Sequence, residues 1–418
     1  MKRITILILL AIIGLSANAQ YTKLLDFTGT ANGANPGGSL ISDGTFLYGM
    51  TYFGGTDSIG VIFKIKPDGT GYSKLLDFNG TNGQYPSGSL ISDGTFLYGM
   101  TYFGGTNGQG VLFKIMPDGT GYSKLLDFGG SIGGHPYGSL ISDGTFIYGM
   151  TSGSGAHNYG TIFKILPDGT GYVDLLDFAG APDGQYPYGS LISDGTFLYG
   201  MTVEGGSDSM GVIFKIKSDG TGYSKLLDFN GTNGAHPEGS LISDGTFLYG
   251  MTYYGGTDSI GVIFKIKPDG TAYTDMLDFT EDAVHGNNPI GSLFSDGTFL
   301  YGMTQFGGTS TNCSSGCGVI FKYGLATGIA ENTANKGTET DFSIYPNPVS
   351  DIVTLNIDNM NNADLTLNIY NAIGELVKSE MLKHNNQQIN IGDLSNGVYM
   401  VTIKSKDFTI TKILIIQR

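Results

Sequence analysis

Short strand-like runs, rich in apolar, aromatic and β-branched residues, recur along the first three quarters of the chain with a period of about fifty residues. In the second copy these runs cover residues 89–92, 95–102, 111–116 and 122–128, and turn residues rich in Gly, Pro and Asp separate them. The pattern predicts four short antiparallel strands per copy, with Asp93-Gly94 as a tight turn. With 68 glycines in 418 residues, the composition also argues against a helical protein.

The two ends of the repeated region are out of phase. The landmark LLDF, once written MLDF, ends at Phe27, Phe78, Phe128, Phe178, Phe229 and Phe279. The last copy stops after its third strand, at Phe321-Lys322. If residues 21–27 supply the missing fourth strand, six four-stranded sheets result and no sheet edge is left open. We therefore predict a six-bladed β-propeller over residues 20–324, closed by the N-terminal strand. A β-solenoid, with its shorter coils, would not need this offset.

Three residue types have structural interpretations inside each copy. The glycine within LYGMT, such as Gly99, would normally weaken a strand, so we expect it to allow neighbouring sheets to approach closely. The methionine that follows it, such as Met100, is expected to fill the core. The aspartates before glycine, such as Asp93, are typical of turns. We expect the LLDF aspartates to bond to the backbone rather than to catalyse.

The copies resemble a known family, the Gloeo/Verruco repeat. In the second copy the shared pattern is Gly83, Pro86, Leu90, Gly94, Leu97-Tyr98-Gly99, Thr101, Gly104-Gly105, Gly110, Phe113 and Gly119. The resemblance covers roughly residues 21–324 and implies a repeated β architecture in exported proteins. It implies no particular activity, so function has to be argued from the residues.

Connections between antiparallel strands alternate between the two faces of a propeller. The Ser-Asp-Gly and Pro-Asp-Gly turns share one face and are nearly identical in every copy, whereas the loops around the repeat proline and the Gly-Gly loops share the other and vary. Binding residues are often displayed on such variable loops. The predicted ligand-binding residues flank the repeat proline and are Tyr85, His135, Tyr137, Tyr186, Tyr188, His236 and Glu238.

Aromatic rings beside carboxylates suit sugars, which present apolar faces and hydroxyl edges. The prediction is a binding module for a glycan or a protein, although the chain has no tryptophan, the best ring for stacking on sugars. Freely drifting loops with no ligand are the alternative structural interpretation. The alternative function is a glycoside hydrolase or lyase, with Glu238, His236 and Tyr188 as the best group. We assign no catalytic residue, cofactor or metal.

The N-terminus predicts export. Lys2-Arg3 precede an apolar run over residues 4–15, and Ala17-Asn18-Ala19 provides the small residues of a cleavage site before Gln20. Residues 1–19 are therefore predicted to be a signal peptide, with a retained membrane anchor as the alternative. A formal net charge of −15 makes a nucleic-acid partner unlikely on electrostatic grounds. Cys313 and Cys317 are predicted to form a local disulfide; a metal pair would lack further ligands nearby in the sequence.

The repeat ends near Gly324 and a different domain follows. Residues 325–341 are rich in Ala, Thr and Asn and predict a linker. Residues 342–418 regain strand patterning and predict a small Ig-like β-sandwich. The candidate strands are 351–358, 365–370, 375–382, 388–391, 398–404 and 408–416.

This tail closely resembles the type A C-terminal sorting domain of the type IX secretion system. The matching motifs are Tyr345-Pro346-Asn347-Pro348, the hairpin from Ile369 to Gly374, Gly397-Val398-Tyr399 and an ending that contains Lys412. The resemblance implies that the secretion machinery is a partner and that the protein is secreted or lies on the outer surface of a Gram-negative bacterium. An accessory sandwich that binds a ligand is the alternative.

Overall fold

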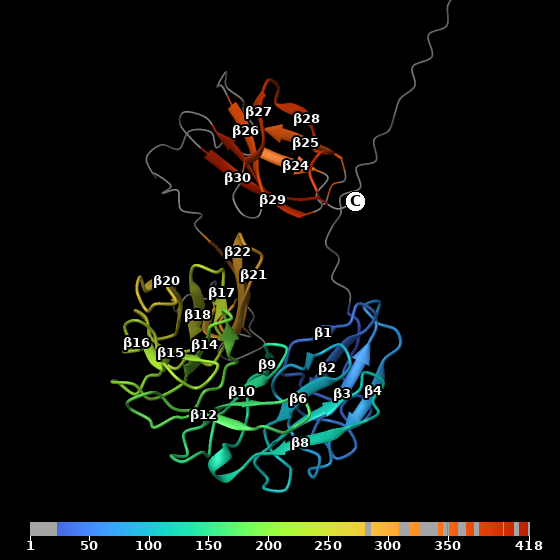
Figure 1. Cartoon of the computed structure of the whole chain (residues 1–418), viewed down its shortest axis with the longest axis vertical. Coiled ribbons are helices and arrows are strands. Elements are labelled where there is room, and N and C mark those ends of the chain that lie inside the picture. Colours follow the sequence, from blue (N-terminus) through green and yellow to red (C-terminus); the bar gives the residue numbers. More distant parts are fainter. Residues whose placement is uncertain are drawn as a thin grey trace, which may run out of the picture. The chain divides into compact units, whose positions relative to one another are not determined.

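The chain forms two compact units, Met1–Thr327 and Gly328–Arg418, in a computed structural model (Figure 1). The division falls inside residues 325–341, the segment predicted as a linker. The structure describes residues 23–280, 286–308, 318–325, 342–345, 349, 351–357, 365–371, 376–395, 397–404 and 409–416.

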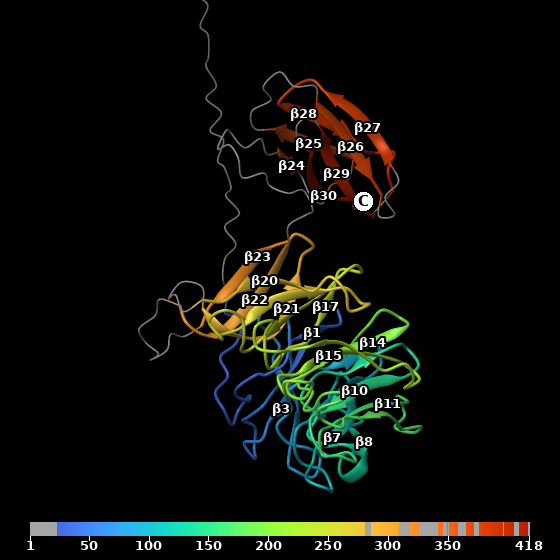
Figure 2. The same cartoon turned by 90° about the vertical axis from the view of Figure 1, so that its left-hand side faces the viewer.

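Six antiparallel sheets build the first unit and follow one another in chain order (Figures 1 and 2). Within each of the first five, neighbouring strands in the sequence are also neighbours in the sheet. The first two sheets are β1 (Ile41–Ser42), β2 (Leu47–Thr51), β3 (Val61–Ile65) and β4 (Ser73–Asp77), then β5 (Ile91–Ser92), β6 (Leu97–Thr101), β7 (Val111–Ile115) and β8 (Ser123–Asp127). The predicted strands of the second copy are thus confirmed, each slightly shorter than expected.

The next three sheets repeat the same order. They comprise β9 (Ile141–Ser142), β10 (Ile147–Thr151), β11 (Thr161–Ile165) and β12 (Val173–Asp177); β13 (Ile192–Ser193), β14 (Phe197–Thr202), β15 (Val212–Lys217) and β16 (Ser224–Asp228); and β17 (Ile242–Ser243), β18 (Leu248–Thr252), β19 (Val262–Ile266) and β20 (Thr274–Asp278). The sixth sheet has β21 (Asn287–Ser295), β22 (Phe299–Phe306) and β23 (Ile320–Gly324). A short 3₁₀ helix, η1, covers Gly130–Ile132. The all-β, propeller-like class of the first unit is confirmed.

Neighbouring sheets pack through the same apolar contacts at each internal junction. Tyr48, Met50 and Ile62 of the first sheet share a core with Leu97 and Phe113 of the second, and all five are nearly inaccessible to solvent. Equivalent clusters lie at the following junctions. Each buried apolar side chain stabilises the fold by about 1.5–3 kcal/mol. The methionine that follows the strand glycine is a core residue in each of these five sheets, as predicted.

The glycine of LYGMT has a different role from the one predicted. A Cβ on Gly99 would lie 2.7 Å from Cζ of Phe113, its ladder partner in the same sheet, and 3.0 Å from Leu90. Glycine here makes room for an aromatic ring of its own sheet, so the predicted role between sheets was wrong. Close approach between sheets occurs instead beside the innermost strands, where a Cβ on Gly88 would lie 2.4 Å from the carbonyl oxygen of Gly138. These glycines lie shortly before the first strand of their sheets, β5 and β9. The first strand of each sheet is therefore the innermost one.

The Asp-Gly turns are held by the aspartate side chain. Asp93 Oδ1 accepts hydrogen bonds from the amides of Thr95 and Phe96, at 2.8 and 2.7 Å, and Oδ2 accepts one from the Tyr98 hydroxyl at 2.7 Å. Burial alone would raise the pKa of this carboxyl, but these hydrogen bonds outweigh it and hold the pKa below its usual value. The same three bonds recur in every copy, for example around Asp194. The interpretation of these aspartates as turn residues is confirmed.

The sixth junction, between the last sheet and the first, is not packed like the others. Ile320 is 81% exposed and Met303 53%, although their counterparts in the other sheets are buried, and Leu40 of the first sheet is 49% exposed. Leu25 and Phe27 pack on the first sheet, with the Phe27 and Phe63 ring centroids 5.3 Å apart, as Phe78 packs on Phe113. Among the described residues no strand pairs with β23 apart from β22. Closure through residues 21–27 as a fourth strand therefore stays a prediction.

A lysine three residues before the LLDF aspartate forms an ion pair in the first, second and fourth sheets. The Nζ–Oδ distance is 2.7 Å for Lys74–Asp77 and for Lys124–Asp127. In the third sheet the lysine is replaced by Asp174, which lies beside Asp177. Burial, the hydrogen bond with Asp177 and the charge of Asp177 together raise the pKa of Asp174 to about 7.

This carboxyl pair predicts a stability that depends on pH. A carboxyl whose pKa is higher in the folded state than in the unfolded state stabilises the fold at pH values below its unfolded-state pKa. This contribution is lost as the pH rises through about 7. Asp174→Lys would replace repulsion by an ion pair. Because this side chain is only partly buried and water screens the pair, we expect only about 1 kcal/mol of added stability at pH 8. At pH 5 the gain should be smaller. Urea unfolding at both pH values measures it, and equal gains would contradict the assignment.

The second unit has two antiparallel sheets. One has the order β24-β25-β28, and the other has the order β27-β26-β29-β30. Their bounds are β24 (Phe342–Tyr345), β25 (Ile352–Ile357), β26 (Leu365–Tyr370), β27 (Leu376–Leu382), β28 (Asn386–Asn390), β29 (Gly397–Lys404) and β30 (Thr409–Ile416). A single apolar core takes side chains from both sheets, among them Leu355, Ile389, Leu367 and Val401. The predicted strands are confirmed within two residues at each end, and an Ig-like topology stays a prediction.

Candidate functional site

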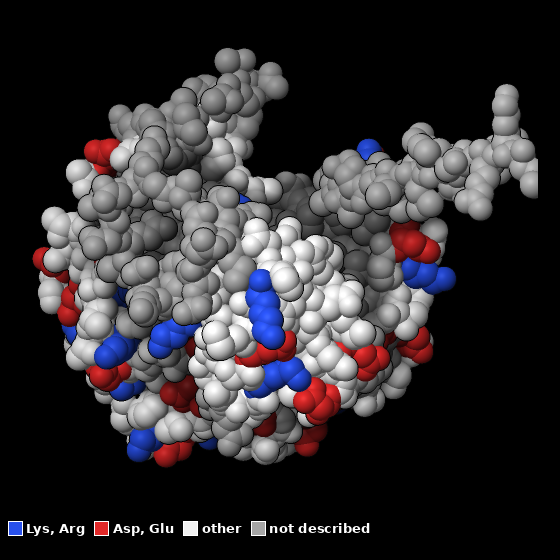
Figure 3. All heavy atoms as spheres, turned by 90° about the horizontal axis from the view of Figure 1, so that it is seen from above, with Lys and Arg blue, Asp and Glu red and all other residues white. Residues whose placement is uncertain are grey.

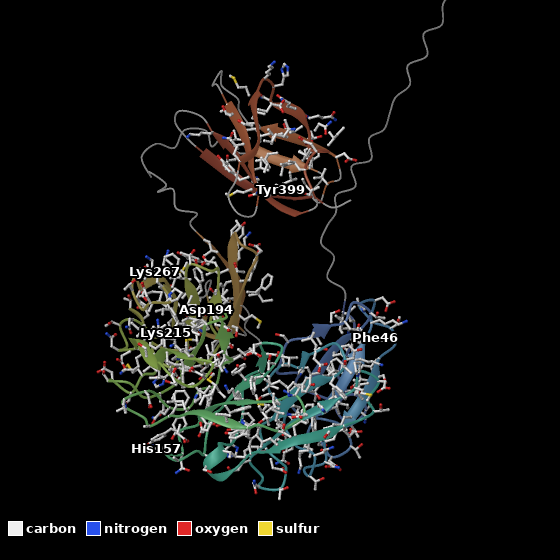
Figure 4. The ribbon with its side chains drawn as sticks, in the orientation of Figure 1. Phe46, His157, Asp194, Lys215, Lys267 and Tyr399 are labelled. Carbon is white, nitrogen blue, oxygen red and sulfur yellow. The ribbon has the colours of Figure 1, made fainter. Side chains whose placement is uncertain are left out.

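The loops around the repeat proline and the Gly-Gly loops lie together, as predicted. In five copies a bridge joins the two loops, for example between Gln84 and Phe103 and between Ala235 and Tyr254. We call the surface that these loops form the loop face, and the opposite surface, with the Asp-Gly turns, the turn face. Figure 4 shows Asp194 and Lys215, at the turn face, close to each other and His157, from a Gly-Gly loop, apart from both.

The residue before the repeat proline joins two neighbouring sheets in the second to sixth copies. Its backbone φ is positive in every copy, between 53° and 57°, as at Tyr85, His135 and His236. This conformation is unfavourable for large side chains, and also before proline. Two backbone hydrogen bonds hold it: the Tyr85 amide donates to Ile59 of the preceding sheet at 2.8 Å, and the Tyr85 carbonyl accepts from Tyr102 at 3.1 Å.

The histidine side chains at this position also bind the preceding sheet. His135 Nδ1 lies 3.2 Å from the Tyr102 carbonyl oxygen, and His236 Nδ1 lies 3.0 Å from that of Val203. A carbonyl oxygen can only accept, so Nδ1 carries the proton in each ring. Asn288 makes the equivalent bond through Nδ2 to Tyr253. These predicted ligand-binding histidines thus have structural contacts that the sequence analysis missed.

Two predicted tyrosines pack against rings of the Gly-Gly loops. Tyr85 stacks on Tyr52 with centroids 5.0 Å apart and an interplanar angle of 16°. Tyr186 meets Tyr159 edge-on at 5.7 Å. Aromatic pairs of this kind contribute about 0.5–1.5 kcal/mol beyond the area they bury. Both tyrosines are half-buried, so part of each ring surface is already used within the protein.

The residues after the proline converge instead at the inner part of the loop face. The Tyr137 ring lies 5.1 Å from that of Tyr188 and 5.9 Å from that of Tyr102. Gly138 follows Tyr137 and Gly189 follows Tyr188, and at these two glycines the backbones of the third and fourth sheets approach closely. Tyr137 is 43% exposed and can still contact a ligand. We call Tyr102, Tyr137 and Tyr188 the tyrosine cluster.

Glu238 lies beside this cluster, because Gly189, which follows Tyr188, packs against the carbonyl group of Gly239, which follows Glu238. Burial raises the pKa of the Glu238 carboxyl, and the nearby His236 opposes that effect. Burial also raises the pKa of Tyr137, Tyr188 and Tyr253, and the negative charge of Glu238 adds to it in all three. The carboxylate therefore influences rings from the third, fourth and fifth sheets. The candidate site comprises the tyrosine cluster, Tyr253 and Glu238.

The structure divides the predicted ligand-binding residues into two groups. Tyr137, Tyr188 and Glu238 come together in the candidate site, whereas the residues before the proline mainly join neighbouring sheets. Tyr102 and Tyr253 were missing from the predicted set, although their place in variable Gly-Gly loops was visible in the sequence. Among the described residues, no group of three or more His, Cys, Asp and Glu side chains could hold a metal ion.

The predicted sorting motifs fall partly within the described residues. Tyr345 ends β24 and is 47% exposed. Gly397 begins β29 opposite Ile416, and Lys412 lies in β30 opposite Val401. Tyr399, labelled in Figure 4, is buried, and its hydroxyl donates to the Ser395 carbonyl at 2.8 Å, so its role there is structural. Of the predicted site residues, seven lie outside the described part: Ala19, Gln20, Cys313, Cys317, Pro346, Asn347 and Pro348.

The first unit is a propeller-like repeat domain with loops of variable sequence on one face. The second is a small domain of two β-sheets. The chain belongs to the Gloeobacter/Verrucomicrobia repeat family, whose model matches residues 91–197 and 192–353. Residues 343–417 match the model of the secretion system C-terminal sorting domain. That domain marks proteins exported by type IX secretion to the cell surface or the extracellular space, so the protein is exported by this route.

Several solved structures show a distant likeness to this chain. The extracellular domain of BT4673 from B. thetaiotaomicron is 12% identical over 91% of this chain and 50% of its own, with a TM-score of 0.47. This chain therefore spans half the length of that one. PorZ, a surface component of the type-IX secretion system of Porphyromonas gingivalis, is 14% identical over 94% of this chain and 61% of its own, with a TM-score of 0.36.

No curated protein sequence matches this chain at a significant level. Within the described residues there is also no helix with the length and apolar character needed to span a bilayer.

Proposed function

We propose that the exported protein is a binding module that recognises a glycan through the loop face. The convergence of the tyrosine cluster with the Glu238 carboxylate supports this proposal. Tyrosine rings offer flat apolar surfaces for the faces of a sugar, and their hydroxyls together with the carboxylate offer partners for its hydroxyl groups. The rigid, repeated sheets below the loops hold these groups in place, which lowers the entropy lost on binding.

The proposal predicts that the two inner tyrosines carry the affinity. In Tyr137→Ala/Tyr188→Ala, each lost ring should cost about 1 kcal/mol or more, so we expect glycan affinity to fall by about thirtyfold in total. The melting temperature should change little, because Tyr137 is exposed and Tyr188 half-buried. A glycan array followed by titration calorimetry measures the loss.

Phe53→Ala provides the matched control. Phe53 is an aromatic residue of the same face, 43% exposed, but it packs on Tyr52 and Tyr85 and lies outside the candidate site. Its replacement should leave glycan binding unchanged. Full binding by the double tyrosine variant would exclude the tyrosine cluster as the site.

A further inference from the structure

The charge around the candidate site is of one sign. Glu238 carries a half-buried carboxylate, and Glu204 of a neighbouring Gly-Gly loop also acts on the pKa of Tyr188. The Glu204 carboxylate accepts a hydrogen bond from the Gln185 amide at 2.8 Å. His236 is the basic group that influences Glu238, and its Nδ1 proton is bonded to the backbone. A ligand that approaches the tyrosines therefore meets negative charge.

The lysines in the described part of the first unit all lie away from the candidate site. The first group lies over the phenylalanines of the Asp-Gly turns and comprises Lys64, Lys114, Lys164, Lys215, Lys265 and Lys322. The second group belongs to the other turns of the turn face and comprises Lys66, Lys217 and Lys267. The third is paired with aspartates three residues later and comprises Lys23, Lys74, Lys124 and Lys225.

This arrangement leaves no ammonium group for an acidic ligand at the inner part of the loop face, within the described residues. Figure 3, which shows the molecule from above, shows lysines lying among carboxylates on that side. An anionic sugar such as a uronate would be repelled by Glu238, whereas a cation would be attracted by the carboxylate and by the faces of the tyrosine rings. The partly buried position of Glu238 strengthens both effects, because water screens them less.

We infer that the glycan bound at the tyrosine cluster carries a free amine. The ammonium group of a 2-amino sugar would lie against Glu238, while the apolar face of the ring lies on Tyr137 or Tyr188. This inference rests on the proposed glycan-binding function and adds the sugar class to it. The ammonium of a lysine side chain has the same chemistry, but the flat rings favour the sugar because a pyranose presents an apolar face to them.

The experiment compares two hexamers with the same β-1,4 linkage on the full exported chain. One consists of glucosamine and the other of N-acetylglucosamine, so they differ in the charge of the amine; an oligogalacturonate serves as the acidic ligand. We expect the glucosamine hexamer to bind about tenfold more tightly than the acetylated one, and the oligogalacturonate not to bind. Glu238→Gln should abolish this preference, whereas Asp208→Asn, an exposed carboxylate of a Gly-Gly loop, should preserve it.

The outcomes separate this inference from the proposed function. If none of the glycans binds the wild-type protein or the wider array, the glycan-binding proposal fails and the inference fails with it. If the two hexamers bind equally, or if the preference survives Glu238→Gln, the amine contact is wrong while glycan binding stands. If hexalysine binds as tightly as the glucosamine hexamer and depends equally on Glu238, the partner is a basic peptide and the sugar class is overturned. Melting curves of both variants verify that they are folded.

Discussion

Gly138→Ala is expected to destabilise the first unit strongly. A Cβ at this position would lie 2.2 Å from the carbonyl oxygen of Gly189 and 2.6 Å from its carbonyl carbon. Both atoms belong to the backbone of the neighbouring sheet, so no change of rotamer relieves the overlap. The sheets would have to separate, which would weaken the 2.8 Å hydrogen bond from the Ser139 amide to Ser190 Oγ. We expect a loss of about 3 kcal/mol, at the upper end for overpacked cores.

Gly324→Ala is the control for this prediction. Gly324 ends β23, and the nearest atoms to the added methyl group would be those of the Phe299 ring, at 3.8 Å, an ordinary contact. This variant should stay within about 0.5 kcal/mol of the wild type. Thermal unfolding followed by circular dichroism compares the two. A Gly138→Ala protein with wild-type stability would show that the inner strands are not packed as closely as described.

The repeat pattern was sufficient to predict the strands and the turns. Both depend on local sequence: residues 95–102 are rich in Phe, Leu, Tyr and Thr, which favours a strand, and Asp93-Gly94 favours a turn whatever lies next to it. The role of Gly99 could not be derived in this way. It depends on the ladder register that places Phe113 opposite Gly99, and the sequence does not contain that register in any local signal.

The candidate site could be predicted in part for a related reason. The position after each repeat proline points to the same place in every copy, so variation among Ser87, Tyr137, Tyr188 and Glu238 was visible as variation at one surface. The contacts of His135 were not predictable, because they involve a carbonyl oxygen 33 residues earlier in the chain, on another sheet. Contacts between sheets therefore separate structural from ligand-binding residues at positions that look alike in the sequence.

The fold explains how one face can change while the other stays constant. The Asp-Gly turns bind their own backbone and, through the lysines, the neighbouring sheet: Lys64 Nζ donates to the Pro117 carbonyl at 3.0 Å and lies 4.8 Å from the Phe46 ring centre. A substitution there would disturb two sheets at once. The side chains after the proline, by contrast, extend from a loop whose backbone is already held by the residue before the proline. They can vary with little effect on stability, which makes them suitable for recognition.

Deletion of residues 342–418 is expected to abolish the appearance of the protein outside the cell. The second unit has its own core of residues such as Val353, Ile369 and Ile403, and the core clusters of the first unit include none of its residues. The shortened chain should therefore still fold, but it would lack the domain that directs export. Immunoblots of cell and medium fractions, with protease treatment of intact cells, measure the loss. We expect the truncated protein to remain inside the outer membrane, provided that the predicted signal peptide carries it across the inner one.

A fusion protein tests whether the truncated chain fails to leave the cell because it lacks the sorting domain or because its first unit is misfolded. Residues 328–418 attached to an unrelated protein with its own signal peptide should bring that protein to the surface or the medium, because the domain folds around a core of its own. The same fusion with Leu367→Asp, which places a charge in that core, should stay inside, since an unpaired buried charge costs several kcal/mol. Normal release of the chain that lacks residues 342–418, or failure of the intact fusion to leave the cell, would contradict the assignment of export to the second unit.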